Sequence, residues 1–374
     1  MAQKPLLSLC MIVKNEEVYL PQCLESARGV VDEIVIVDTG STDNTRSIAK
    51  QYGASVYEYE WQDDFAAARN YSLEKANGVF ILFLDADEEL SPNAKEQLRP
   101  LLLQNDAEGF YLIVRCFGSV NSLAPFYDSE QVRLFRNRPQ YRFENAIHEM
   151  IYPSIVAHGG KLIKGDLIIH HYGYLKQVVQ ASESRIERDR RLLEKMYQED
   201  PTSQYVKAKL GFIYLLQSRY PEALQLLQEV VQEIDSRNVE ADFLHTIFIA
   251  LAQTAQAMGN YALARECARA GWALNTQPSL TRSSKFYYAT STAASILSHL
   301  EALTQESKEP LARSRVQEDL ARCSKEIDES ISILNELYAD RDLSPQAKEN
   351  LAIWQQKTEL VRQMVERISE MMTG

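Results

Sequence analysis

The stretch that most constrains the fold is Gly78–Leu90, with the sequence GVFILFLDADEEL. It opens with the continuous apolar run Val79–Leu84 and passes directly into a group of carboxylates, Asp85, Asp87, Glu88 and Glu89. An unbroken apolar run is typical of a strand covered on both faces, as in a parallel sheet flanked by helices. In open α/β sheets, ligands bind at the carboxyl ends of such strands. The sequence therefore predicts an α/β fold with a ligand site directly after this strand.

The acidic residues after this strand form a DxD pattern. Asp85 and Asp87 are two residues apart, so their side chains would point to the same side of an extended backbone. Carboxylate oxygens on one side suit Mg²⁺ or Mn²⁺, which proteins usually share with substrate phosphates. A solvated acidic turn is the alternative interpretation of so short a pattern.

The N-terminal part of the chain alternates strand and helix patterns. Strands are expected at Leu6–Val13, Glu33–Val37, Ala54–Tyr59 and Gly78–Leu84, and Asp64 is expected to begin the third intervening helix. Short connections between alternating elements predict a parallel sheet with helices on both faces. Three of the strands end in polar residues, which would gather at one edge of the sheet.

Two common phosphate-binding motifs are absent from the sequence. No GxGxxG follows the first strand, and no GxxxxGK[ST] occurs anywhere. A bound phosphate is therefore expected to be held by a metal ion and by arginine, for which Arg69 is a candidate. The missing glycine-rich loop also argues against a nucleotidyltransferase.

Composition excludes several classes of partner. The formal net charge of -12 provides no basic field for non-specific nucleic-acid binding. The 5 cysteines show no CxxC pairing, which predicts reduced and mostly buried thiols in a cytoplasmic protein. Met1–Pro5 is polar, and no stretch approaches the roughly 18 apolar residues of a membrane span. We therefore expect neither a signal peptide nor a membrane span.

Four blocks of the first part of the chain resemble family-2 glycosyltransferases with the GT-A fold. They are Cys10–Glu17, Ile36–Thr45, Trp61–Asn70 and Leu84–Glu88, and they stand in the family's order and at its spacing. Within that family, the chain resembles the bacterial branch with a C-terminal helical-repeat extension. This branch includes lipopolysaccharide-core glucosyltransferases and S-glycosyltransferases that modify peptides.

The resemblance implies a role for individual residues. Asp87 would ligate Mn²⁺ or Mg²⁺ directly, and Asp85 with Ala86 would approach the ribose or a metal-bound water. Asp64 would lie near the base and Arg69 near the ribose or phosphates. The residues that would hold the base and ribose of the nucleotide are Val13, Lys14, Asn15, Glu16 and Asp38. A divalent cation stabilises a diphosphate leaving group without a proton donor.

The second half of this domain begins near Gly109, where the pattern changes to antiparallel or mixed strands at Gly109–Phe117 and Gln131–Arg136. The loop Gly118–Ser129 between them is interpreted as a plain connection or as the border of an acceptor site. The resemblance also implies that a late histidine completes the metal site. His171 is the candidate and His170 the alternative, because neighbours in a strand point to opposite faces and neutral imidazole suits Mn²⁺.

Glu149 is the candidate general base. Inverting transfer needs a carboxylate that accepts the proton of the attacking acceptor. A structural salt bridge with Arg133 or Arg136 is the alternative interpretation of Glu149, and His148 and Arg133 are candidate accessory residues. Glu88, Glu89 and Glu144 are the alternative candidates for the general base.

From about Lys176 the strand pattern ends and helices follow. Gln204–Ile234 matches the tetratricopeptide (TPR) pattern, a weaker copy follows it, and later helices are expected at Ser283–Leu303, Leu311–Ala339 and Pro345–Met372. We predict a GT-A domain over residues 1–175 and an all-α TPR-like domain over residues 176–374. Such repeats usually form a binding or dimerisation surface, so acceptor binding and homo-oligomer formation are both compatible with it.

The leading hypothesis is a metal-dependent inverting glycosyltransferase. It would transfer a hexose from a nucleotide sugar, UDP-linked in the favoured interpretation, to a glycan, a lipid or a peptide. The alternative is a non-catalytic TPR scaffold on a degenerate nucleotide-binding domain. That alternative predicts lost ligands, yet Asp38, Asp85, Asp87, Glu149 and His171 are all present.

Overall fold

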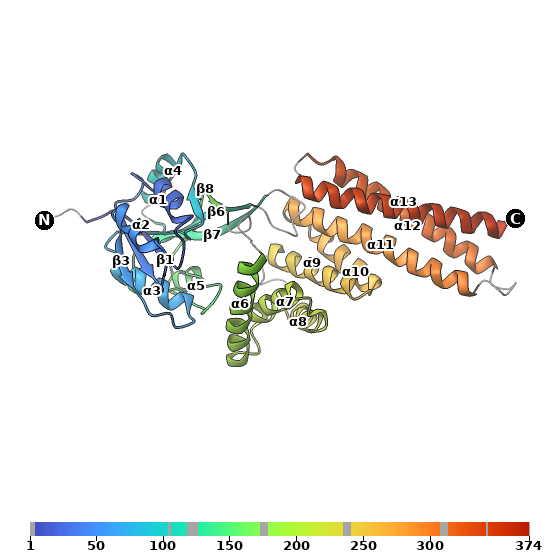
Figure 1. The fold of residues 1–374 in the computed structure, drawn as a ribbon, viewed down its shortest axis with the longest axis horizontal. Helices are drawn as coiled ribbons and strands as arrows, with labels where there is room; N and C mark the ends of the chain where they lie inside the picture. The colour runs from blue at the N-terminus through green and yellow to red at the C-terminus, as the bar shows by residue number, and fades with distance from the viewer. Residues whose placement is uncertain are drawn as a thin grey trace. The chain divides into compact units, whose positions relative to one another are not determined.

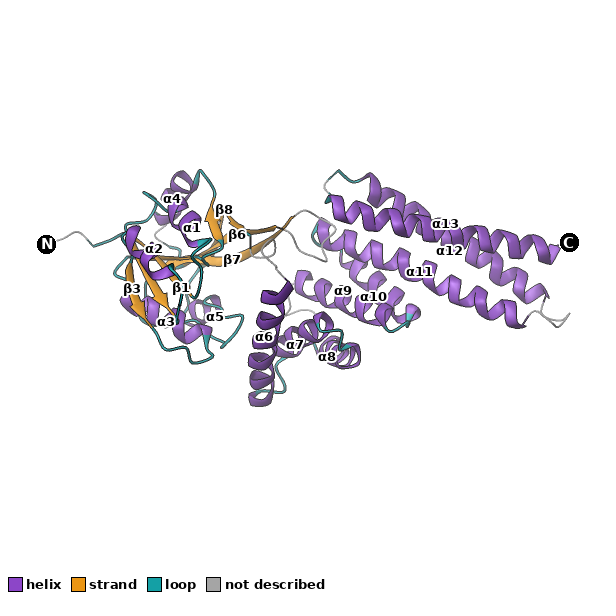
Figure 2. Cartoon of the chain, viewed as in Figure 1, coloured by secondary structure: helices purple, strands orange, loops and turns teal. Residues whose placement is uncertain are grey.

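The protein consists of two compact units, a mixed α/β unit and an all-α unit (Figure 2). In the part of the chain that is described, the first unit ends at Leu192 and the second begins at Leu193. The predicted boundary between residues 175 and 176 lies outside the described residues. The computed structural model describes residues 4–103, 106–117, 126–172, 179–234, 241–306, 313–341 and 343–373.

A single mixed sheet forms the centre of the first unit, and its strand order is β3-β2-β1-β4-β7-β6-β8-β5. The first four strands are parallel, as the sequence predicts, and β7 pairs antiparallel with both β4 and β6. The remaining partner of β6 is β8, which runs parallel to it. The strands are β1 (Leu7–Val13), β2 (Glu33–Asp38), β3 (Ser55–Glu58), β4 (Phe80–Phe83), β5 (Glu88–Leu90), β6 (Gly109–Phe117), β7 (Phe126–Arg136) and β8 (Leu162–His171).

Helices cover both faces of this sheet (Figure 1). One face packs against α1, α2 and α4, and the other packs against α3 and α5. The helices of this unit are α1 (Leu20–Ser26), α2 (Thr45–Gln51), α3 (Phe65–Lys75), α4 (Ala94–Leu102) and α5 (Tyr152–Ala157), followed by α6 (Val179–Glu199), which continues past Leu192.

The apolar run of β4 explains this double cover. Phe80 and Leu82 belong to the core on the α1 side, whereas Ile81 and Phe83 belong to the core on the α3 side. Because side chains alternate between faces, a strand covered on both sides needs apolar residues at every position. This part of the sequence prediction is confirmed.

The short strand β5 was not predicted. Glu88 and Glu89 lie opposite His171 and His170 of β8 in an antiparallel pair. Acidic residues have low strand propensity, and the sequence analysis assigned no strand to these residues. Pairing with β8 overrides that preference and brings the DxD segment beside the late histidines.

The second unit is made of helices, as predicted from the repeat pattern. The first two predicted repeats correspond to the helix pairs α7–α8 and α9–α10, and three long helices follow. Gly211 of the first pair faces Leu227 of the second helix so closely that a Cβ would lie 2.8 Å from the Leu227 side chain. The helices are α7 (Gln204–Leu216), α8 (Tyr220–Glu233), α9 (Ala241–Ala257), α10 (Tyr261–Leu274), α11 (Pro278–Glu306), α12 (Arg313–Ala339) and α13 (Pro345–Thr373).

The sequence predicted reduced, mostly buried cysteines and no membrane span. All five cysteines are free and buried. Across the described ranges, no helix combines the length and the apolarity that crossing a bilayer requires.

A buried histidine lies in the core of the second unit. His245 is fully buried, its Nδ1 lies 2.6 Å from Oγ1 of Thr276, and its Nε2 lies 2.8 Å from Oγ of Ser284. Burial lowers the pKa of His245, although Asp242 opposes the shift. The folded state therefore favours the neutral imidazole.

We expect His245 to make the second unit acid-sensitive. As the pH falls through the unfolded-state pKa of about 6.5, the unfolded chain binds a proton that the folded state does not, so the free energy of unfolding decreases. The free energy of unfolding should be measured with urea at neutral pH and at a pH near 5.5. It should decrease less between these two pH values in His245→Gln than in wild type. The exposed His158→Gln serves as the control. Equal decreases in the free energy of unfolding in wild type and His245→Gln would contradict the role given to His245.

Close packing at Gly211 gives a second expectation. Gly211→Ala should lower the free energy of unfolding by about 1–3 kcal/mol, because overpacking against Leu227 outweighs the better helix propensity of alanine. In the Leu227→Ala background the same substitution should be neutral or stabilising. Thermal unfolding of wild type, the two single variants and the double variant measures the coupling between the two positions. Additive effects would show that contact with Leu227 does not cause the destabilisation.

Candidate functional site

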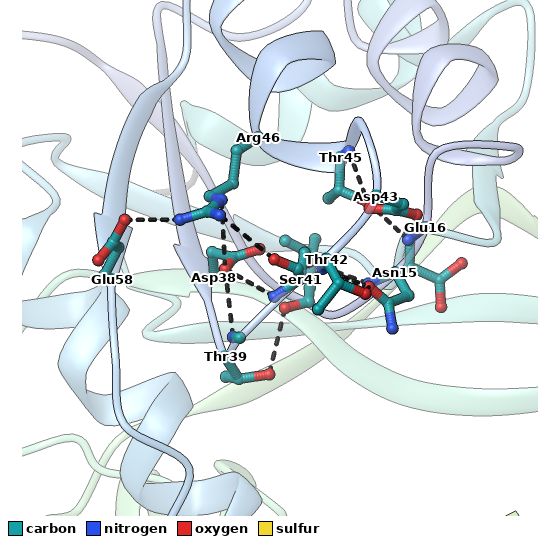
Figure 3. Close-up of polar contacts among 12 residues, drawn as sticks. Asn15, Glu16, Asp38, Thr39, Ser41, Thr42, Asp43, Thr45, Arg46 and Glu58 are labelled. Carbon is teal, nitrogen blue, oxygen red and sulfur yellow. Dashed lines mark hydrogen bonds and ion pairs between the residues drawn. The ribbon is translucent and has the colours of Figure 1, made fainter.

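Two loops at the carboxyl edge of the parallel strands are joined to each other by hydrogen bonds (Figure 3). The amide of Asn15 donates to Oγ of Ser41 at 2.9 Å, and the amide of Thr42 donates back to Oδ1 of Asn15 at 2.8 Å. The amide of Glu16 donates to Oγ1 of Thr45 at 2.7 Å. The two predicted nucleotide-binding blocks thus form one connected surface.

Asp38 ends β2 beneath these loops. Its Oδ1 accepts from the amides of Gly40 and Ser41 at 3.1 and 3.0 Å, and Nε of Arg46 lies 3.9 Å from the same oxygen. Oδ2 is buried and has no hydrogen-bond partner within the described structure. A buried carboxylate oxygen without a partner is costly, so this atom is suited to accept a hydrogen bond from a ligand.

The other predicted residues of this edge have different environments. Val13 is buried and pairs with Asp38 in the sheet, and its carbonyl accepts from the amide of Thr39. Lys14 is exposed. Asp64 is the N-cap of α3, as predicted, because its Oδ1 accepts from the amide of Ala67 at 2.8 Å.

Arg69 lies at the centre of the predicted site. Its Nε lies 2.5 Å from Oε1 of Glu149, and its Nη2 lies 2.6 Å from Oδ1 of Asp85. The side chain is 7% exposed. Arg69 therefore joins the two carboxylates that the sequence assigned to the donor and to the base, and Glu149 pairs with Arg69 rather than with Arg133 or Arg136.

Arg133 also contacts Asp85, and it binds Glu88. Its Nη2 lies 2.7 Å from Oε1 of Glu88 and 3.6 Å from Oδ2 of Asp85. The ladder between β6 and β7 shifts register here, since Tyr111 lies opposite Val132 while Phe110 lies opposite Leu134, which leaves Arg133 as the extra residue. Such bulges redirect side chains.

The ring of Phe83 lies between the apolar core and these guanidinium groups. The Cζ atoms of Arg133 and Arg69 lie 4.5 and 4.9 Å from the centre of the ring. Nε and Nη1 of Arg133 are buried without a hydrogen-bond partner in the described residues. The aromatic ring therefore supplies part of the electrostatic stabilisation that these nitrogens lack.

The DxD segment forms a turn, whereas the sequence suggested an extended backbone. The amide of Glu88 donates to the carbonyl of Asp85 at 3.0 Å, and the amide of Asp85 donates to Oε2 of Glu88 at 2.8 Å. The two aspartates consequently have separate partners, and Ala86 is buried between them. Burial disfavours ionisation of Asp85, but Arg69 and Arg133 hold the pKa of its carboxyl well below the usual value.

Asp87 and His171 face each other across the β5–β8 pair. Oδ1 of Asp87 lies 3.6 Å from Nε2 of His171, whose Nδ1 lies 3.4 Å from Sγ of Cys116. Burial would lower the pKa of His171, but Asp87 and Cys116 raise it to about 11 in the absence of a metal ion. His170 instead packs its ring edge-on against Phe117 at 5.6 Å.

The pair of Asp87 and His171 fits a divalent cation. One hard oxygen and one imidazole nitrogen 3.6 Å apart can contact a common ion, and this donor set suits Mn²⁺. Among the described residues, no group of three or more His, Cys, Asp or Glu side chains could hold a metal. Two protein ligands leave the remaining positions to diphosphate oxygens and water, as is common for Mg²⁺ sites.

Glu149 lies in a tight loop. Glu144 and Met150 form an isolated antiparallel bridge with reciprocal backbone hydrogen bonds of 3.0 Å, which closes the loop between them. Asn145 and His148 in this loop have left-handed φ values of 74° and 55°. Glu149 has a side chain that is 12% exposed, whereas Glu144 is exposed.

Glu88 and Glu89, the other two candidates for the general base, contact other residues. Glu88 is fully buried against Arg133, and burial raises the pKa of its carboxyl to about 7 despite that arginine. Oε2 of Glu89 accepts from Gln22 and from the hydroxyl of Tyr172 at 2.8 and 3.1 Å.

Left-handed residues other than glycine cluster around this site. In the described part of the first unit they are Asn15, Asp63, Asn145 and His148. Each lies in a loop that carries a predicted site residue. Such backbone conformations cost free energy and are concentrated at functional sites.

Several residues of the site were not predicted. Ser41 and Thr45 join the loops, Cys116 contacts His171, and Phe83 lies under both arginines. Ser41 and Thr45 stand in a matched block, which was the only signal that pointed to them. The β6–β8 and β4–β7 pairings that bring in Cys116 and Arg133 are long-range and leave no local pattern.

Loss of Arg69 should strongly destabilise the first unit. Arg69→Met would leave Asp85 and Glu149 without their shared cation, and removing one partner of a buried ion pair costs about 3–5 kcal/mol. Lys161→Met, which breaks the exposed pair with Asp106, should leave the free energy of unfolding nearly unchanged. Urea unfolding of both variants tests this, and equal costs would contradict the buried network.

Comparison with known proteins gives a match to one family. Residues 8–165 match the family model described as Glycosyl transferase family 2. This range contains the strands of the sheet except the first residue of β1 and the last six residues of β8, and it contains the predicted site residues except His171 and its alternative His170.

Individual relatives are consistent with this match. A TPR repeat-containing protein of Synechococcus elongatus is 36% identical over 232 residues, 60% of this chain and 56% of that protein. The lipopolysaccharide core biosynthesis glycosyltransferase LpsC of Rhizobium meliloti is 32% identical over 159 residues, 40% of this chain and 57% of that protein. The chain therefore spans somewhat more than half the length of each.

A solved structure, S. aureus TarS 1-349 in complex with UDP-GlcNAc, aligns with 71% of this chain and 92% of its own, with 16% identity and a TM-score of 0.42. The family match and the sheet topology together bear out the GT-A fold and the glycosyltransferase family that the sequence predicted. The first unit of this chain carries a family 2 glycosyltransferase domain, and a TPR-like helical region follows it.

Proposed function

We propose that this protein transfers a hexose from a UDP-sugar to an acceptor, with inversion and with the help of a divalent cation. The observation that carries the proposal is the pairing of Asp87 with His171 beside the turn that Arg69 and Arg133 anchor. This arrangement lies at the carboxyl edge of a family 2 domain, where a nucleotide sugar is expected.

The base and ribose would occupy the surface between the first two loops. Asp38 offers a buried oxygen without a partner, which suits an N–H or O–H donor of the nucleoside. Asn15 and Glu16 are already fixed by Ser41 and Thr45, so this surface is formed before the donor arrives. Preorganisation of this kind lowers the entropic cost of binding.

The diphosphate would lie next to Asp87 and His171, which would hold Mn²⁺ or Mg²⁺. A bound cation would neutralise the charge that develops on the departing diphosphate. Arg69 and Asp85 hold the adjacent turn in place. Because their side chains are paired with each other, we assign them to positioning rather than to direct neutralisation of phosphate.

Glu149 would act as the general base. It would accept the proton of the acceptor as the acceptor oxygen or sulfur forms a bond to the anomeric carbon and the bond to the diphosphate breaks. The ion pair with Arg69 fixes the position of the Glu149 carboxylate within the loop. His148, next to it in a left-handed conformation, would orient Glu149 or contact the sugar.

The acceptor is proposed to be a bacterial glycan or glycolipid. One relative is named for lipopolysaccharide core biosynthesis, and a peptide acceptor is the alternative that the resemblance implies. The helical region would bind the acceptor or a second copy of the chain. Helical repeats have no catalytic groups of their own and serve as binding surfaces.

Ligand-dependent stability tests the donor site. UDP and Mn²⁺ together should raise the melting temperature by several degrees, since a ligand at about 100 times its Kd adds about 2.7 kcal/mol. Asp87→Ala should abolish the joint effect, whereas Asp106→Ala, a change at an exposed aspartate, should retain it. If no nucleotide shifts the wild-type protein in the presence of metal, the scaffold hypothesis becomes the better one.

Release of UDP from a panel of UDP-hexoses tests the base. Glu149→Gln should reduce the rate about 10²- to 10⁴-fold while UDP still binds with Mn²⁺. Glu144→Gln is the matched control, because it changes an exposed glutamate at the closure of the same loop. A large loss in Glu144→Gln with little loss in Glu149→Gln would transfer the role of base to Glu144.

A further inference from the structure

We propose that Arg188 and Arg191 of helix α6 position the donor site by holding the turn Trp61–Phe65, which precedes α3. Neither residue lies within the stretch that matches the glycosyltransferase family. The expected effect on donor binding rests on the proposed function. The contacts between α6 and the turn are observed independently of it. It assigns the first part of α6 to the transferase machinery.

The turn has an unusual backbone and closes on itself. Asp63 is left-handed, with a φ of 59°, and its Oδ1 accepts from Nε1 of Trp61 at 2.9 Å. The rings of Trp61 and Phe65 meet edge-on with their centres 4.7 Å apart. Aspartate adopts this conformation more readily than most residues do, and the contacts of Asp63 fix it in the turn.

Helix α6 supplies two contacts that hold the turn. Arg191 binds Asp63 through both terminal nitrogens, Nη1 to Oδ2 at 2.5 Å and Nη2 to Oδ1 at 2.8 Å. One turn earlier, Cζ of Arg188 lies 4.9 Å from the ring centre of Phe65. Residues three apart share a helix face, so both arginines reach the turn from the same side.

The turn lies where three parts of the site meet. The side chain of Asp64, predicted to lie near the base, caps α3. The amide of Phe65 donates to the carbonyl of Ala146 at 2.8 Å, which ties the turn to the loop that carries Glu149. Arg69 follows on the same helix. A shift of the turn would therefore move the cap, the base loop and the central arginine together.

The contacts are suited to positioning rather than to global stability. The side chains of Arg191 and Asp63 are 56% and 35% exposed, and exposed ion pairs contribute little to the free energy of unfolding. A two-point arginine contact nevertheless fixes geometry. The expected signature is a looser turn and weaker donor binding in a protein that unfolds at nearly the wild-type temperature.

Hydrogen exchange of the Phe65 amide in the full-length protein tests the contacts without a ligand. The double variant Arg188→Ala/Arg191→Ala should exchange this amide at least about threefold faster, because the turn loses both contacts from α6. Arg28→Ala is the matched control, because Arg28 also makes a two-point pair, with Glu25, and lies over an aromatic ring, that of Tyr52. Unchanged exchange in the double variant would overturn the inference.

UDP titration in the presence of Mn²⁺ tests the consequence. The double variant should raise the Kd of UDP about three- to tenfold, and Arg191→Lys should recover part of the loss. Asp63→Asn keeps the backbone preference and the Trp61 contact but removes the charge, so it should weaken binding in wild type and have no further effect with Arg191→Ala. Faster exchange with an unchanged Kd would overturn the positioning role. If wild type binds no UDP, the proposed function fails, and the exchange measurement still decides the contacts.

Discussion

A buried chain of ion pairs organises the site. It runs from Glu149 through Arg69 to Asp85, and from there through Arg133 to Glu88. Four of these side chains are largely buried and Asp85 is partly exposed, and burying such ionisable groups is costly unless a neighbour of opposite sign contacts them. These ion pairs connect elements that are distant in sequence, so the positions of Glu149 and of the DxD turn depend on one another.

The same interactions explain why the DxD segment is a turn. Glu88 accepts from the amide of Asp85 and is itself held by Arg133, which a bulge in β7 directs into the site. Asp87 is thereby left for His171, across the β5–β8 pair. The two aspartates of the motif have different surroundings: Asp85 contacts Arg69 and Arg133, and Asp87 faces His171.

Local patterns were sufficient for much of the fold. The apolar run before Asp85 identified a covered strand, alternating elements identified the parallel sheet, and Asp64 marked the start of α3. The repeat around Gly211 identified the first helical pair. Each of these signals depends on residues that are close in sequence, where backbone geometry and burial leave a recognisable period.

The remaining features depend on long-range pairing. Strand β5 is acidic and pairs with β8, which is distant in sequence, so its own residues carry no strand pattern. The choice of Arg69 as the partner of Glu149 follows from how α3 meets the loop closed at Met150, and no local pattern encodes that meeting. Resemblance to the family supplied candidate residues, but it did not show which carboxylates pair with which arginines.

Electron paramagnetic resonance of Mn²⁺ tests the central claim most directly. We predict that the protein suppresses the signal of free Mn²⁺ when UDP is present, because Asp87 and His171 would provide two ligands and the diphosphate would provide others. His171→Ala should restore the free signal, and His170→Ala should not. Persistence of free Mn²⁺ in wild-type protein with saturating UDP, or loss of binding through His170 rather than His171, would contradict the account.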